Sequence, residues 1–228
     1  MKLRLPAALA TTAVLALGAA ACGEEESSTP TAGSSGSASS KSTPEPAAQI
    51  DQLTGRSTAV TLDSGFVEAL TSLKVAPGPV GSAEITETGS AVFPITAGDV
   101  KYYKPGTVSP YVQGKILHEG SGLSLTAGST KVVLRDFLVD PGKSVLTGNV
   151  LVNGKMAAEA APLFFLDGST LEPLSVKTSD MTGVLTGTTV KLKQEAADLL
   201  NKTFKIDALK AGLVIGVARI VVELPEPK

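Results

Sequence analysis

The side chains best suited to chemistry in this sequence are its single histidine, His118, and its three tyrosines, Tyr102, Tyr103 and Tyr111. The stretch 111–119 has the alternation of a β-strand, and this alternation places His118 on the apolar face of the strand. All three tyrosines precede the histidine closely. The four residues are therefore our candidate ligand-binding set.

His118 has two interpretations. It is either a hydrogen-bonded core or rim residue, with the tyrosines as strand residues whose hydroxyls are exposed, or one half of a tyrosine–histidine pair that faces an apolar slot, as in haem proteins. The segment Gly120-Ser121-Gly122 that follows would let a ligand approach the backbone closely. The sequence alone leaves both interpretations open.

Catalytic signatures are few. The only cysteine, Cys22, lies near the N-terminus, and Ser121 is not part of a G-x-S-x-G elbow. The sequence has no phosphate-binding or dinucleotide motif and no cysteine–histidine set for a metal. Asp136, Asp140 and Asp167 each lie beside a turn, where we expect their side chains to bond turn amides. We therefore predict a protein without enzymatic activity, although a serine–lysine pair or paired carboxylates stay open.

The N-terminus predicts export. Lys2 and Arg4 precede an uncharged apolar run, 5–17, and small residues then lead to Cys22, the layout of a secretory signal. The residues 19–22 resemble the lipobox of bacterial lipoproteins, with alanine where leucine is usual three places before the cysteine. This resemblance implies a signal peptide over 1–21, and acyl chains such as palmitate on Cys22 that anchor the protein to the outer face of the cell membrane. An ordinary signal peptide is the alternative.

Residues 22–57 are rich in Ser, Thr, Gly, Pro and Ala, and we expect the lipidated cysteine to be followed by a disordered tether. Residues 58–228 suit a single domain. Removal of Lys2 and Arg4 with the signal peptide leaves 18 basic against 22 acidic residues, a net charge of −4. This mild acidity gives no electrostatic reason to bind nucleic acid. We expect the membrane as a partner through the lipid anchor, and the sequence leaves a small-molecule or envelope partner open.

Helical spacing predicts a short helix over 64–73, capped by Asp63 or Ser64 and ended by Pro77 and Pro79, and a second helix over 194–202. A third turn is expected over 207–211. Short strand patterns are predicted over 59–62, 83–86, 91–96, 100–103, 111–119, 123–126, 131–139, 145–152, 163–166, 183–192 and 213–224. The Asn153-Gly154 pair predicts a tight hairpin. These features indicate a mainly β fold, an antiparallel β-sandwich with two or three short helices, whose last strand lies inside the sheet.

Several phrases resemble a group of actinobacterial secreted or lipid-anchored proteins without known activity. They are FPIT at 93–96, HEGSGLSL at 118–125, DFLVDPG at 136–142, APLFFLDGSTLEPL at 161–174 and LLNKTF at 199–204. More distantly, the layout is similar to the HtaA family of haem-binding domains, an antiparallel β fold in which His118 would match the family histidine. The family's second haem contact is a tyrosine of the first helix, where this chain has Phe66.

These observations predict a membrane-anchored extracytoplasmic lipoprotein whose HtaA-like domain binds a small or apolar ligand, with haem the leading candidate cofactor. One alternative is a structural or adhesive envelope module, for which a filled interior and an outward-facing His118 are expected. The other is an envelope lipid carrier, for which we expect a dry cavity lined by residues such as Phe164, Phe165, Leu213 and Ile215.

Overall fold

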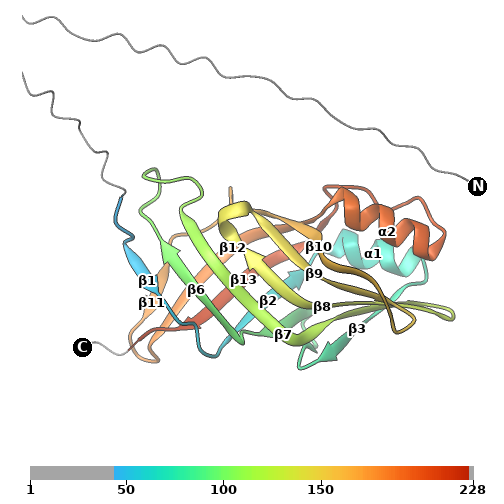
Figure 1. Cartoon of the computed structure of the whole chain (residues 1–228), viewed down its shortest axis with the longest axis horizontal. Helices are drawn as coiled ribbons and strands as arrows, with labels where there is room; N and C mark the ends of the chain where they lie inside the picture. The colour runs from blue at the N-terminus through green and yellow to red at the C-terminus, as the bar shows by residue number, and fades with distance from the viewer. Residues whose placement is uncertain (1–43, 226–228) are drawn as a thin grey trace, which may run out of the picture. The chain divides into compact units, whose positions relative to one another are not determined.

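The computed structural model describes residues 44–225, so the predicted signal peptide, Cys22 and most of the predicted tether lie outside it. Within this range the chain forms strands joined by short connections, with two α-helices and one 3-10 turn (Figure 1). The strands are β1 (Ala48–Ile50), β2 (Ser57–Leu62), β3 (Ala76–Gly81), β4 (Glu84–Ile85), β5 (Ser90–Pro94), β6 (Ala97–Tyr102), β7 (Val112–Ala127), β8 (Thr130–Asp140), β9 (Val145–Val152), β10 (Lys155–Asp167), β11 (Ser175–Lys177), β12 (Thr182–Leu192) and β13 (Val214–Glu223). The helical elements are α1 (Ser64–Ser72), η1 (Pro141–Lys143) and α2 (Gln194–Phe204).

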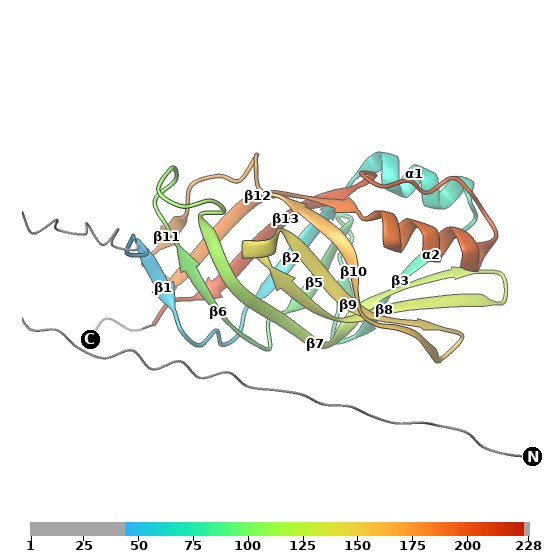
Figure 2. The ribbon, with the colours of Figure 1, turned by 45° about the horizontal axis from the view of Figure 1, so that its top comes forward.

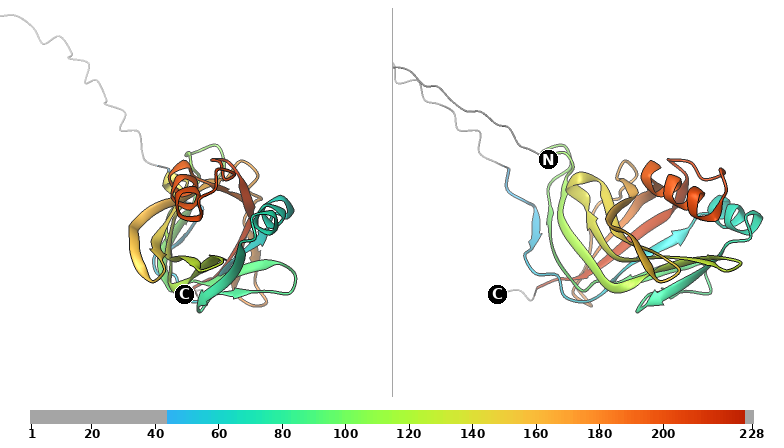
Figure 3. Two further views of the ribbon diagram at one scale, coloured as in Figure 1. Left: turned by 90° about the vertical axis from the view of Figure 1, so that its right-hand side faces the viewer. Right: turned by 45° about the vertical axis from the view of Figure 1, so that its right-hand side comes forward.

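The prediction of a mainly antiparallel β fold is confirmed, but the sandwich is replaced by one curled sheet. Pairing runs without interruption in the order β1-β6-β7-β8-β9-β10-β12-β13-β2-β5-β4, with β3 added to β7 and β11 to β12. The sheet bends back on itself where β5 leads into β6, because Thr96 N donates to Leu117 O of β7. The result is a half-barrel, seen along its length in Figure 3, left. In a sandwich the apolar side chains pack between two sheets, whereas here they face the interior of the one curled sheet.

The two helices cap the same end of the half-barrel (Figure 2), since β2 and β12 run in the same direction and each is followed by a helix. Asp63 caps α1 as predicted, accepting from Gly65 N and Phe66 N. Pro77 does not end this helix. It lies with Pro79 in β3, which pairs only with β7, and an edge strand tolerates proline.

Three further local predictions concern a hairpin, the last strand and a helical turn, and the first two are confirmed. The Asn153-Gly154 hairpin is confirmed: Val152 pairs with Lys155, and both turn residues have positive φ. The last strand lies inside the sheet as expected, between β12 and β2. No third helical turn forms over 207–211, where the Asn201 side chain instead bonds both the N–H and the carbonyl of Leu209.

The folded domain begins before residue 58, which corrects the predicted boundary of the tether. Strand β1 pairs with β6 along its three residues. Leu53 is only 2% exposed, and its N–H donates to Gly98 O at 2.7 Å. A leucine this deeply buried belongs to the core. Among residues 44–225, no helix is long and apolar enough to cross a membrane.

Candidate functional site

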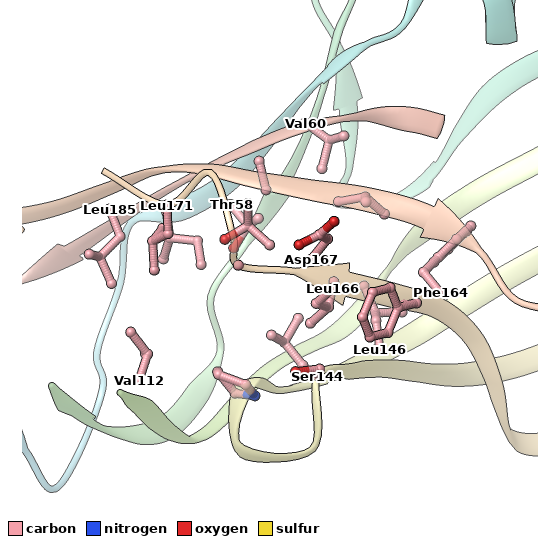
Figure 4. Close-up of a pocket in the computed structure, with 18 of the residues that line it drawn as sticks. Thr58, Val60, Val112, Ser144, Leu146, Phe164, Leu166, Asp167, Leu171 and Leu185 are labelled. Carbon is pink, nitrogen blue, oxygen red and sulfur yellow. The ribbon is translucent and has the colours of Figure 1, made fainter. Parts of the chain in front are cut away.

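The half-barrel encloses a cavity of about 410 Å³, which we call cavity 1. Residues of β2, β5, β7, β8, β9, β10, β12 and β13 line it, and most of them are apolar (Figure 4). Three connections form its rim: 109–111 before β7, 141–144 after β8 and 167–171 after β10. A concave, largely apolar cavity with a few polar groups is typical of a small-molecule site.

His118 lies in the wall of cavity 1 and is only 1% exposed. The prediction of two separate strands over 111–119 and 123–126 is wrong. Strand β7 runs through the HEGSG segment as a single strand with a bulge. Pairing with β8 shifts between His118 and Gly122, and the Ser121 hydroxyl donates to His118 O at 3.0 Å. Bulges re-aim side chains, and this one follows directly after the histidine that faces the interior.

Both ring nitrogens of His118 have protein partners. Nδ1 lies 2.9 Å from Pro94 O on β5, and Nε2 lies 3.2 Å from Thr58 Oγ1 on β2. A carbonyl oxygen can only accept, so Nδ1 carries the proton and Nε2 accepts from the Thr58 hydroxyl. Burial lowers the pKa of His118 below its ordinary value of 6.5, and the bond to Pro94 opposes this only in part. The imidazole is therefore neutral at pH 7.

Of the three predicted tyrosines, only Tyr111 lines cavity 1 together with His118 in the described structure. Tyr111 lines the rim of cavity 1, but its hydroxyl donates to Leu171 O at 3.4 Å, and its ring packs edge-on against Tyr102 with centroids 5.8 Å apart. Tyr102 accepts from Leu174 N, and Tyr103 is 8% exposed. None of the three has a hydrogen bond or ring contact with His118 in the described chain, where Thr58 is the side chain that hydrogen-bonds with the histidine.

Sequence reasoning missed Thr58 and Pro94, the two partners of His118. Thr58 lies on the inward face of β2 and Pro94 ends β5, and the two residues are 60 and 24 positions from the histidine. The signal available in the sequence was weak. Thr58 lies two positions before the inward-facing Val60, so it was the polar residue of that face.

Two of the three aspartates bond amides of the turns beside them, as predicted: Asp140 accepts from Lys143 N and Asp167 from Ser169 N. The prediction is wrong for Asp136, which lies within β8 and accepts from Gly120 N of the neighbouring strand β7. Asp167 lies on the rim of cavity 1, where the Lys191 ammonium at 2.7 Å holds the pKa of its carboxyl well below the usual range. Among the residues that line cavity 1 in the described structure, Asp167 is the only charged one.

A second hollow of about 270 Å³, cavity 2, adjoins cavity 1. Four residues line both: Val112, Pro141, Leu185 and Ile220. Strand β1 contributes Ala48 and Ile50 to the wall of cavity 2, and Tyr102 is also part of it. The predicted cavity lining is partly found. Phe164, Phe165 and Ile215 line cavity 1, although Phe165 is also 44% exposed, whereas Leu213 is not part of the wall.

Comparison with known proteins finds similarity in the fold but not in the sequence. No family model matches this chain, and no curated protein matches it. The C-terminal domain of HtaA from Corynebacterium glutamicum superposes with a TM-score of 0.52 at 13% identity, covering 75% of this chain and 97% of that domain. The heme binding protein HtaB from the same organism gives a TM-score of 0.38 at 10% identity, over 77% of this chain and 96% of HtaB. The HtaA-like fold expected from the sequence is thus supported, and at this identity the likeness concerns the fold alone.

Proposed function

We propose that this domain binds an apolar ligand in cavity 1, with haem the leading candidate and His118 as the residue that contacts it. Support comes from an enclosed apolar cavity in a fold shared with the C-terminal domain of HtaA. The resemblance of the sequence to HtaA-type haem-binding domains adds the ligand class. The proposed role is binding, not catalysis.

The observation that carries the proposal is the orientation of the His118 ring. Histidines that ligate metals donate one ring N–H to a carboxylate, backbone carbonyl or water, which fixes the tautomer and directs the other nitrogen at the metal. His118 has the first part of this arrangement: Nδ1 is bonded to Pro94 O, the residue is part of the lining of cavity 1, and Nε2 carries a lone pair. Only the hydroxyl of Thr58 occupies that lone pair, and a hydroxyl can rotate away.

The residues present therefore fit a haem iron in one respect, since the neutral imidazole of His118 could bind the iron. When bound, the haem would supply the iron centre. The chain would supply the imidazole, its fixed tautomer and the apolar walls that exclude water. Tyr111 lines the same cavity, whereas Tyr102 and Tyr103 are not part of its wall, and His118 is the one residue that we propose as an iron ligand.

A hemin titration tests the proposal, with the full chain carrying Cys22→Ser so that no attached acyl chain competes. We expect a saturable, shifted Soret band that weakens at least tenfold in His118→Ala. Thr58→Val, which frees Nε2 without removing the ring, should bind hemin at least as tightly. Tyr102→Phe serves as the matched control and should leave the band unchanged. Far-UV circular dichroism verifies that each variant is folded, and a band indifferent to His118 would exclude this role.

The structural or adhesive alternative required a filled interior and an outward-facing histidine. Cavity 1 and the inward position of His118 do not favour it. No specific observation in the described residues supports a docking surface, so we do not develop this function.

We further propose that acyl chains on Cys22 anchor the domain to the outer face of the cell membrane, as the lipobox resemblance implies. Two or three chains hold a protein stably in a bilayer, whereas one does so only marginally. Detergent phase partitioning of the protein expressed in an actinobacterial host tests this. The wild-type chain should enter the detergent phase and Cys22→Ser the aqueous phase, and identical partitioning of the two would refute the anchor.

A further inference from the structure

Cavity 2 lies beyond the part of the site that the proposed function uses. Its walls come from β1, β6, β7, β12 and β13, and from Leu224 and Pro225 after the last strand. Strand β1 covers it as the edge strand of the sheet, held to β6 by three residue pairs. None of the residues that line cavity 2 in the described structure is charged.

The two cavities lie in series along β13. Ile215 lines cavity 1, Ile220 lines both cavities, and Val222 lines cavity 2. At about 3.3 Å per strand residue, the apolar lining from Ile215 to Val222 extends for roughly 23 Å. The acyl chain of a membrane lipid spans one leaflet, about half of the roughly 30 Å hydrocarbon core. The path is therefore long enough for a whole acyl chain.

The volumes of the two cavities distinguish a short acyl chain from a long one. A methylene group fills about the volume of a water molecule in the liquid, roughly 30 Å³, so the 410 Å³ of cavity 1 hold about 13 methylenes by that measure. The additional 270 Å³ of cavity 2 hold about 9 more. An eight-carbon chain thus fits in cavity 1, whereas a sixteen-carbon chain and its head group need cavity 2.

The polar groups of the rim indicate the head group. Ser109, Ser144 and Ser169 line cavity 1 at its rim, and Asp167, the one charged residue of the lining, is neutralised by Lys191. No lysine or arginine lines either cavity in the described part of the chain. Hydroxyl and ester groups can hydrogen-bond with serine hydroxyls, whereas a phosphate head group would lack a cation.

We infer that cavities 1 and 2 form one binding track for a neutral lipid with a long linear acyl chain, which passes between Val112, Leu185 and Ile220. This inference shares cavity 1 with the proposed function and adds a second compartment and a second ligand class. Each methylene moved from water into the apolar track should tighten binding about fourfold. A planar macrocycle in cavity 1 makes no use of cavity 2.

Native mass spectrometry of the full chain with Cys22→Ser tests the track, using 1-monopalmitoylglycerol and 1-monooctanoylglycerol as ligands. The wild-type track should bind the sixteen-carbon ester at least a hundredfold more tightly than the eight-carbon ester. Ala48→Phe, which fills cavity 2 from the edge strand, should weaken the long-chain ester at least tenfold and leave the short-chain ester within twofold. The matched control is Ala47→Phe, at an exposed position outside the cavity wall, and it should change neither.

Ile50→Trp is a second variant that fills cavity 2, for use if Ala48→Phe unfolds the protein. Thermal melting verifies the fold of each variant. Equal affinity for both esters in the wild-type chain, or long-chain binding that tolerates a filled cavity 2, would overturn the inference. Hemin titrations of the same proteins separate the two hypotheses. Hemin binding without ester binding defeats the lipid track alone, and ester binding without hemin binding defeats only the haem proposal.

Discussion

At the scale of single residues, His118 joins three strands that are distant in the sequence. Its ring bonds Thr58 on β2 and Pro94 on β5 while its own backbone belongs to β7. It therefore stabilises the corner where the sheet bends back on itself, with or without a ligand. Its ring also packs edge-on near Phe93, with centroids 6.3 Å apart. The same contacts that fix the tautomer for a ligand thus hold the fold together.

Because burial lowers the pKa of His118 in the folded protein below 6.5, acidification should destabilise the fold. As the pH falls through about 6.5, the unfolded imidazole gains a proton while the folded one stays neutral, so the free energy of unfolding falls. Between pH 7.5 and 5.5 this accounts for at most about 1.4 kcal/mol. Urea unfolding at the two pH values should show a larger loss for the wild type than for His118→Gln. Equal losses would show that the histidine does not titrate as expected.

At the scale of elements, a row of bulges bends the sheet beside cavity 1. Pairing shifts between Arg135 and Leu138 for β8 with β9, and between Ala158 and Ala161 for β9 with β10. These shifts continue the one that follows His118 on β7. Bulges bend a strand and increase its twist, so a row of them across four strands curls the sheet as a unit.

Side chains hold this row together. Asp136, with a positive φ of 55°, accepts from Gly120 N at 2.9 Å and from Asn149 Nδ2 at 3.3 Å. Asn149 in turn accepts from Ala160 N at 3.0 Å. Burial raises the pKa of Asp136, but the bonds from Gly120, Arg135 and Asn149 outweigh it and leave the pKa below its ordinary value. The carboxylate therefore stays ionised and holds β7, β8 and β9 at the bend.

Two glycines of the β7 bulge should respond differently to alanine. A Cβ on Gly122 would lie 2.1 Å from Leu134 O and 2.7 Å from Arg135 Cα, whereas Gly120 has open space but a φ of +72°. Gly120→Ala should lower the free energy of unfolding by about 1–2 kcal/mol, the cost of the left-handed backbone. Gly122→Ala should lower it by about 3 kcal/mol or more, because backbone atoms must move. Chemical denaturation measures both, and equal costs would contradict this account of the bulge.

At the scale of the whole molecule, the interior of the half-barrel serves both the core and the cavities. The segment before residue 58 completes this interior: β1 covers cavity 2, and Leu53 is buried in the core. Arg56 Nε lies 3.3 Å from Glu223 at the end of β13, but both side chains are largely exposed, and such ion pairs add little. The burial of apolar side chains is thus the main contribution of this segment to the stability of the fold.

Leu53→Ala should therefore lower the free energy of unfolding by about 2–5 kcal/mol, as expected for a buried leucine. Val67→Ala is the matched control, since this aliphatic side chain on α1 is 43% exposed, and it should change the free energy by no more than about 0.5 kcal/mol. Thermal or urea unfolding compares the two. A loss of unfolding free energy for Leu53→Ala as small as that of the control would indicate that the segment before residue 58 belongs to the tether and not to the folded domain.

The sequence by itself determined the local features of this protein. The Asp63 cap, the Asn153-Gly154 hairpin, the interior last strand and the mainly antiparallel β class all follow from residue types within a few positions of one another. The inward side of His118 also follows, because alternation along a strand fixes it.

Only the tertiary structure decided how the sheet closes and what His118 contacts. Thr58 and Pro94 meet the histidine through the bend between β5 and β6, and a strand pattern carries no information about such a bend. The sequence did not predict β3, which contains proline, or β1, which follows polar residues. Both strands form because they pair with partners distant in the sequence, β3 with β7 and β1 with β6. The cavities were equally hidden, since an apolar residue that lines a cavity and one that packs in a core obey the same alternation. The difference lies in the volume that the strands enclose, which depends on all of them together.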